Sequence, residues 1–167
     1  YKDLPLRLSD TDVLHRLEKS GTLAGLFRTR KMQQDDAHIF ITEDQIEEEY
    51  GRILKIADHF YSIFGLEYHL RLGTRPEKFL GDKKVWDKAE KALKRILEKS
   101  GKEYFVLEGD GAFYGPKIDI LMKDILEREW QMGTIQLDFQ LPARFKLKYV
   151  ESDGSEKTPV VILSLIH

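Results

Sequence analysis

Two stretches of the sequence repeat apolar residues every three or four positions, and each is bounded by residues typical of helix ends. The first follows Thr42, which forms a capping box with Gln45, and it stops at Gly65. The second runs from about residue 82 to 99 and stops at Gly101. The sequence therefore predicts two amphipathic helices.

The remaining apolar runs alternate with period two, which is typical of half-buried strands. They precede the first helix, separate the two helices, and dominate the chain after residue 103; the later runs are "EYFVLE", "PKIDILMKD", "REWQMGTIQLDFQ", "RFKLKYV" and "TPVVI". Strands, two helices and then a meander of strands predict an α+β domain, an antiparallel sheet flanked by helices.

Composition limits the function classes. The 167 residues fit one domain or one domain plus part of another, with 41% hydrophobic and 34% charged residues. The net charge of −2 gives no global cationic field for nucleic acid, although a local patch stays possible. The chain has no cysteine and no apolar run near the roughly 18–20 residues of a transmembrane helix.

The stretch "QQDDAHIF" sets amides, carboxylates and an imidazole directly before an apolar run. In an extended chain, Gln34, Asp36 and His38 share one face. Asp and His are plausible metal ligands, and Asp also accepts a hydrogen bond from a hydroxyl group. The pattern alone fits either the floor of a polar pocket or a solvated strand.

Three other segments carry polar groups that could bind a ligand. In "HRLEKSGTLAGLFRTR", Arg16 and Glu18 are expected on one face of a strand, with Arg28 returning from a loop. This is either a polyphosphate clamp or a surface Arg–Glu pair beside a hairpin. The glycines of "GDGAFYGPKIDI" permit close approach to a ligand beside Tyr114 and Lys117, or simply form a hairpin. "WQMGTIQLDF" adds two glutamines near strand ends, Gln131 and Gln136.

Six segments, in order, resemble the catalytic domain of threonyl-tRNA synthetases. They are "LPLRL", "HRLEKSGTLAGLFRTR", "QDDAHIF", "TRPEKFLGD", "GDGAFYGPKIDI" and "GTIQLDFQLPARF". The resemblance implies residues 1–162 of a partial class II aminoacyl-tRNA synthetase catalytic domain, truncated at both ends. The parent would activate threonine with ATP and transfer it to tRNA(Thr) in the cytoplasm, typically as a homodimer.

The resemblance also implies residue roles. Arg16 would bridge the ATP α-phosphate and the amino-acid carboxylate, Glu18 would lie near the adenine amine, and Arg28 would reach the γ-phosphate. Lys117 is implied as a catalytic, phosphate-side contact. Gln131 and Gln136 would line the nucleotide pocket.

For the amino acid, the resemblance implies contacts from Gln34, Asp36 and Tyr114, and His38 as one of three zinc ligands. Mg²⁺ would accompany ATP. Two alternatives stay open: a non-catalytic synthetase-like RNA-binding or regulatory module, which predicts an eroded site, and a class II synthetase for another amino acid such as proline or serine.

The sequence departs from the family pattern in several places. The first zinc ligand, a cysteine, would precede Tyr1, and Leu163 stands where the third, a histidine, is expected. Ala24 and residues 31–33 also differ from the family in the mobile loop. The final letters "LSLIH" match a translation of the mosaic-end sequence used in transposon-based library preparation, so we expect residues 163–167 to be a sequencing or assembly artefact.

We predict that the isolated 167-residue chain does not activate threonine, because the resemblance places essential segments outside it. The measurement is threonine-dependent exchange of pyrophosphate into ATP. Exchange above the level seen without threonine would contradict the prediction.

Overall fold

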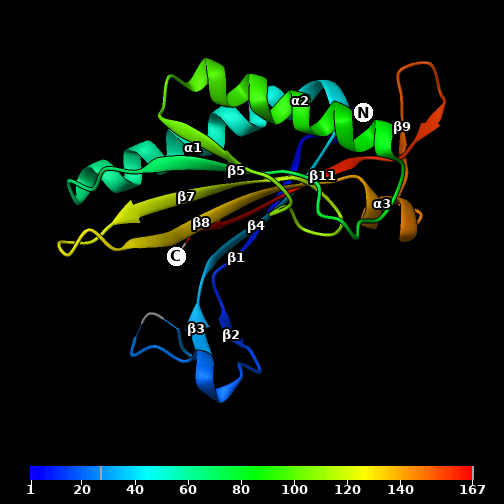
Figure 1. Ribbon diagram of the computed structural model, residues 1–167. Helices are drawn as coiled ribbons and strands as arrows, with labels where there is room; N and C mark the ends of the chain where they lie inside the picture. The colour runs from blue at the N-terminus through cyan, green and yellow to red at the C-terminus, as the bar shows by residue number, and fades with distance from the viewer. Residues whose placement is uncertain (27, 167) are drawn as a thin grey trace.

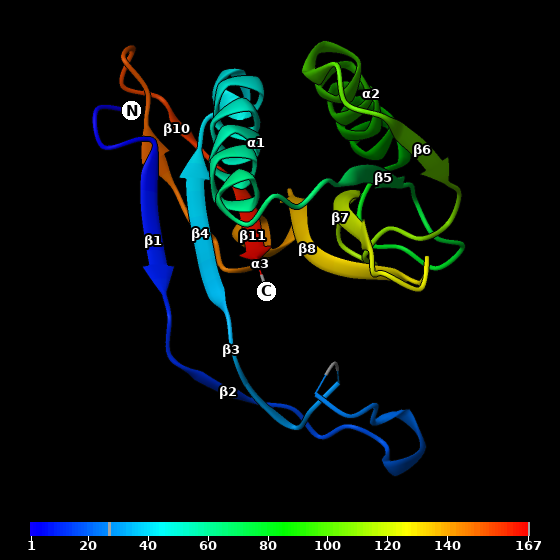
Figure 2. The same cartoon turned by 90° about the vertical axis from the view of Figure 1, so that its left-hand side faces the viewer.

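The computed structural model describes residues 1–26 and 28–166 and contains a seven-stranded sheet with the order β1-β4-β11-β8-β7-β5-β6. Helices α1 and α2 both cover one face of this sheet (Figures 1 and 2). The strands of the main sheet are β1 (Leu6–Asp10), β4 (Asp35–Ile41), β5 (His69–Gly73), β6 (Tyr104–Leu107), β7 (Lys117–Lys123), β8 (Glu129–Asp138) and β11 (Val160–Ile166). A mostly antiparallel sheet with helices confirms the predicted α+β class.

The smaller elements lie outside this sheet. Strands β2 (Val13–His15) and β3 (Lys31–Gln33) form a ribbon that projects away from the helices (Figure 2). Strands β9 (Tyr149–Val150) and β10 (Glu156–Lys157) pair separately. The described residues also form the short helices η1 (Ser20–Thr22), η2 (Glu43–Gln45) and α3 (Gln140–Arg144).

The core lies between the sheet and the two long helices, α1 (Ile46–Ile63) and α2 (Lys83–Ser100). Each strand turns alternate side chains toward the helices, so Ile41, Leu72 and Ile120 are almost fully buried there. Helix α2 adds Trp86 and Leu93 to the buried set. Within the described residues, neither long helix is long and apolar enough to cross a membrane.

Both predicted helices are confirmed, with the expected end signals. The capping box of Thr42 and Gln45 is formed, and it opens η2, which leads directly into α1. Asp82 caps α2 by accepting a hydrogen bond from the backbone N–H of Lys84, and Gly101 ends the helix with a positive φ of 68°.

A partly buried ion pair ties α1 to the edge strand β1. The Arg7 guanidinium donates two hydrogen bonds, of 2.7 and 2.6 Å, to the Glu49 carboxylate, whose side chain is 1% exposed. These bonds hold the pKa of Glu49 below its usual value, despite the opposing effect of burial. Arg7 thereby fixes the first turns of α1 over the strand that leads into the ribbon.

Two parts of the predicted strand meander are wrong. The run "RFKLKYV" was predicted as a strand, but only Tyr149–Val150 are extended. Asp138 accepts hydrogen bonds from the N–H groups of Gln140 and Leu141, which starts α3 instead. Strands β5 and β6 pair in parallel, because α2 connects them and returns the chain in the same direction.

We predict that Ile120→Ala lowers the free energy of unfolding by about 2–5 kcal/mol, because Ile120 is fully buried in the middle of β7. The matched control is Ile56→Ala on α1, where the isoleucine is 55% exposed and the change should stay within about 0.5 kcal/mol. Urea unfolding of both variants gives the comparison. Equal losses in the two variants would contradict this view of the core.

Candidate functional site

The loop at the end of the ribbon of β2 and β3 is held by hydrogen bonds to its own backbone carbonyl groups. The N–H of Arg16 donates to the carbonyl of Arg30 at 2.9 Å, which extends the ladder of the ribbon by one step. The Arg30 guanidinium in turn donates two bonds of 3.3 Å to the carbonyl of Glu18. Arg30 therefore stabilises the conformation of the loop, whereas the side chains of Arg16 and Arg28 are exposed.

A groove of about 440 Å³ lies between this loop and β8. Arg16, Glu18 and Arg28 line it from the loop, and Gln131 lines it from β8. Strand β2 ends at His15, so Arg16 and Glu18 do not lie on a strand as predicted, although both line the same groove. The structure thus brings together four of the residues singled out in the sequence.

A second group of predicted residues lies at and beside β4. Gln34 and Asp36 are buried or partly buried, while the His38 side chain is 46% exposed. The Nδ1 atom of His38 lies 3.7 Å from Oδ1 of Asp36, which places both side chains on one face as the period-two pattern predicts. That Oδ1 atom is buried, and within the described residues it has no hydrogen-bond partner.

Strand register joins this group to the third one. Leu163 on β11 pairs with His38 on one side and with Gln136 on the other, and Gln136 pairs with Lys117. Because paired residues point to the same face, these four side chains form one row across β4, β11, β8 and β7. Their sequence neighbours Ile39, Ile118, Leu137 and Ile162 lie in the core, so by alternation the row lies on the sheet face opposite the helices.

Tyr114 reaches this row from the turn before β7. Its hydroxyl group donates to Oε1 of Gln136. Burial, with a smaller contribution from the nearby Asp138 carboxylate, raises the pKa of Tyr114, so the phenol stays protonated at neutral pH and remains a donor.

The glycines of the loop before β7 serve protein contacts. A Cβ atom on Gly111 would lie 2.6 Å from the carbonyl oxygen of Thr74, and one on Gly115 would lie 1.8 Å from that of Leu137. The predicted alternatives were a ligand cradle and a hairpin. In the described structure, the close approach is made to neighbouring strands.

Three charged residues that sequence reasoning missed surround Lys117. Its Nζ atom lies 3.0 Å from carboxylate oxygens of both Asp110 and Asp119, and Arg71 also pairs with Asp119. Arg71 and Asp119 each interrupt an apolar strand, in "HLRLG" and "KIDIL". The sequence did contain a signal for these residues: a charged residue within an otherwise apolar strand needs a partner of opposite charge when it is buried.

Zinc is the metal that the resemblance implies, and the residues present do not complete a site for it. Asp36 and His38 could contribute two ligand atoms, but the position paired with His38 is Leu163, which has none. Among the described residues, no group of three His, Cys, Asp or Glu side chains could hold a metal ion.

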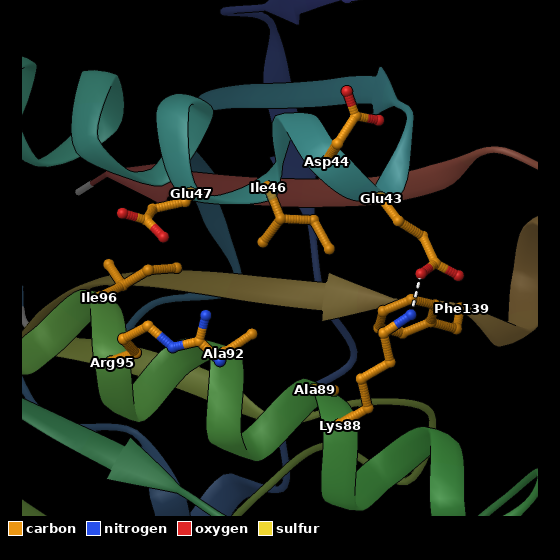
Figure 3. A pocket seen from close by; sticks show the side chains of 10 residues that line it. All are labelled: Glu43, Asp44, Ile46, Glu47, Lys88, Ala89, Ala92, Arg95, Ile96 and Phe139. Carbon is orange, nitrogen blue, oxygen red and sulfur yellow. Dashed lines mark hydrogen bonds and ion pairs between the residues drawn. The ribbon is translucent and has the colours of Figure 1, made fainter.

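A separate hollow of about 250 Å³ lies between α1 and α2, on the other side of the sheet (Figure 3). Its walls mix apolar side chains such as Ile46 and Phe139 with charged ones, and the ion pair of Lys88 and Glu43 spans one end. It contains no residue that the sequence singled out as a candidate.

Comparison with known proteins gives consistent matches. The model of the tRNA synthetase class II core domain (G, H, P, S and T) matches residues 1–165. A threonine–tRNA ligase of Desulfatibacillum aliphaticivorans is 53% identical over all 167 residues, which are 26% of its own length. The chain thus spans about a quarter of the curated relatives it matches.

Solved structures agree with this match. The RNA binding domain of threonyl-tRNA synthetase from Cryptosporidium parvum Iowa II superposes with a TM-score of 0.94 at 50% identity, covering 99% of this chain and 42% of that one. Prolyl-tRNA synthetase from Cryptosporidium parvum superposes with a TM-score of 0.67 at 16% identity, over 99% of this chain and 29% of that one. The second likeness shows the fold alone.

We predict that Gly115→Ala lowers the free energy of unfolding by about 1–3 kcal/mol, because the added methyl group would overlap the Leu137 carbonyl oxygen. Gly21→Ala is the matched control, since nothing lies within 4 Å of a Cβ atom there. Urea unfolding compares the two variants. A Gly115→Ala variant as stable as Gly21→Ala would show that the turn before β7 is not held against β8.

Proposed function

Because the chain belongs to the family of class II tRNA synthetase core domains, we propose that it supplies the nucleotide site and part of the amino-acid site of a threonine–tRNA ligase. The observation that carries the proposal is the groove that joins Arg16, Glu18, Arg28 and Gln131. Two exposed guanidinium groups facing an exposed amide suit a nucleotide triphosphate.

The proposed reaction has two steps. In the first, a carboxylate oxygen of threonine attacks the α-phosphorus of ATP, the bond to the bridging oxygen of the β-phosphate breaks, and pyrophosphate leaves. In the second, a ribose hydroxyl of tRNA(Thr) takes the threonyl group, and AMP leaves. Both steps develop negative charge on oxygen, so fixed cations lower their barriers.

In this proposal the groove residues hold the nucleotide. Arg16 binds the α-phosphate and the threonine carboxylate together, which brings the reacting atoms close and opposes the charge on phosphorus. Arg28 binds the γ-phosphate end, and Glu18 accepts a hydrogen bond from the adenine amine. Gln131, Gln136 and Lys117 contact the nucleotide from the sheet.

The amino acid would lie over β4 and the Tyr114 side chain. Asp36 suits the threonine hydroxyl group, because its side chain is 25% exposed and its Oδ1 atom has no hydrogen-bond partner among the described residues. Valine, nearly the same shape, would leave that oxygen unpaired, at a cost of about 1–3 kcal/mol. In this proposal Gln34 and Tyr114 also contact the amino acid.

The metals and partners follow from the same proposal. Mg²⁺ would be held by the ATP phosphates and would offset their charge. His38 alone supports the zinc prediction, and we derive no step through zinc, because the residues present do not complete its site. tRNA(Thr), a cytoplasmic location and a homodimeric parent remain parts of the proposal.

We expect Arg16→Ala, made in the complete ligase, to lower kcat/KM for threonine-dependent pyrophosphate exchange by about 10²–10³-fold. The matched control is Arg52→Ala, which removes an exposed arginine from α1, on the opposite side of the sheet. Circular dichroism shows whether either variant changes the fold. If Arg16→Ala and Arg52→Ala lower kcat/KM equally, the groove is not the nucleotide site.

The same exchange assay decides between amino acids. Threonine should support exchange far better than valine, serine or proline in the wild-type ligase. Preference for proline or serine would point to another class II ligase, and exchange with none of them would favour a non-catalytic module.

A further inference from the structure

Beside the groove, three neighbouring strands place charged and polar residues in one register row. Arg71 on β5 pairs with Asp119 on β7, and Asp119 pairs with Thr134 on β8. Their side chains therefore point to the same sheet face, the one that the helices leave open. The Asp119 side chain is fully buried, so a bound molecule cannot touch it directly.

Asp119 has a fixed partner on every side. Arg71 donates bonds of 3.0 and 2.7 Å to Oδ2, and Thr134 donates one of 2.9 Å to Oδ1. The Lys117 ammonium lies 3.0 Å from Oδ2. Two cations and a hydroxyl group thus offset the cost of burying this carboxylate, and the carboxylate in turn fixes where they lie.

The same row fixes Gln131, which lines the groove. Arg71 donates to Oε1 of Gln131 at 3.0 Å, and Gln131 donates to the hydroxyl oxygen of Thr134 at 2.6 Å. Both partners are themselves bonded to Asp119. A change at Asp119 therefore reaches Gln131 without any direct contact between the two residues.

Lys117 has a second carboxylate partner of a different kind. Asp110 lies on the loop between β6 and β7, and its side chain is 35% exposed. Its Oδ2 atom is 3.0 Å from the Lys117 ammonium and 3.6 Å from Arg71, yet it has no hydrogen bond within the described residues. The Lys117 ammonium lies equally close to Asp110 and Asp119. Hydrogen bonds from Arg71 and Thr134 fix Asp119, whereas Asp110 Oδ2 has none within the described residues, so Asp110 is held less firmly.

Gly73 explains how the loop reaches this position. A Cβ atom there would lie 2.9 Å from the carbonyl oxygen of Asp110 and 3.0 Å from Cε of Lys117. The loop and the lysine stem therefore occupy the space that any larger residue would fill. Asp110 is held near Lys117 by its backbone, and its side chain is 35% exposed although the Oδ2 atom that faces the lysine is buried.

We propose that Asp119 is a positioning residue that holds Lys117 and Gln131 for a bound nucleotide, and that Asp110 is a replaceable partner whose place at the Lys117 ammonium a phosphate group takes. The identification of that phosphate with ATP rests on the proposed function. The Asp110 carboxylate, which is partly exposed and has no hydrogen bond at Oδ2 within the described residues, is displaced, and the buried Asp119 carboxylate stays.

The test is calorimetric titration of a non-hydrolysable ATP analogue with Mg²⁺, and separately of threonine, using the complete ligase. Asp119→Asn should raise the nucleotide Kd about tenfold or more, while the threonine Kd changes less than about twofold. Asp110→Asn should lower the nucleotide Kd about threefold, because the phosphate no longer competes with a carboxylate. The opposite signs are the signature of the proposal.

Asp138→Asn is the matched control, since Asp138 is as buried as Asp119 and caps α3. It should lower Tm and leave the nucleotide Kd within about twofold. If Asp119→Asn does not fold, Thr134→Val tests the same row, because it removes the bonds to Asp119 and Gln131 and keeps every charge. Thr134→Val should weaken nucleotide binding in the same direction.

If Asp110→Asn binds the nucleotide more weakly than the wild type, the proposal that a phosphate group replaces Asp110 at Lys117 is wrong. An Asp119→Asn variant that weakens threonine and nucleotide binding equally would reduce Asp119 to a structural residue. A wild-type ligase that binds the nucleotide but shows no threonine-dependent exchange would refute the proposed function and leave this inference standing. A wild-type ligase that does not bind the nucleotide would refute both.

Discussion

The structure depends on strand register across β4, β11, β8 and β7. Because side chains alternate between faces, one register puts Ile39, Ile120 and Ile135 against the helices and turns Asp36, Asp119 and Thr134 to the other face. A slip of one residue in β4 or β7 would turn Asp36 or Asp119 toward the helix layer. The apolar core and the polar face are therefore two results of the same pairing, and neither can change alone.

Much of the fold could be predicted from local pattern. Periods of 3.6 and 2.0 residues identified both long helices and the β4 face, because those signals need only a few neighbouring residues. The run "RFKLKYV" misled, since Asp138 starts a helical turn that the alternation does not reveal. The parallel pairing of β5 and β6 was also missed, because it depends on where α2 returns the chain.

The site was less predictable than the fold. Arg16 and Gln131 line one groove although they are far apart in the sequence, and the residues alone contain no signal of that proximity. The resemblance supplied it by grouping the segments. Asp119 was overlooked because it lies within an apolar strand, where its burial and its partners become evident only with the strands paired. Long-range electrostatic partners are what sequence pattern reveals least.

The chain connects the ribbon that bears Arg16 and Arg28 to the body through β1 and β4, while the opposite wall of the groove belongs to the sheet. A molecule bound across the groove would contact both the ribbon and the sheet, and would therefore hold the ribbon in place against the body of the domain. Since these contacts exist only in the folded arrangement, binding would stabilise the whole chain against unfolding. The ribbon would gain most, because the strand pairing recorded for it is local, between β2 and β3.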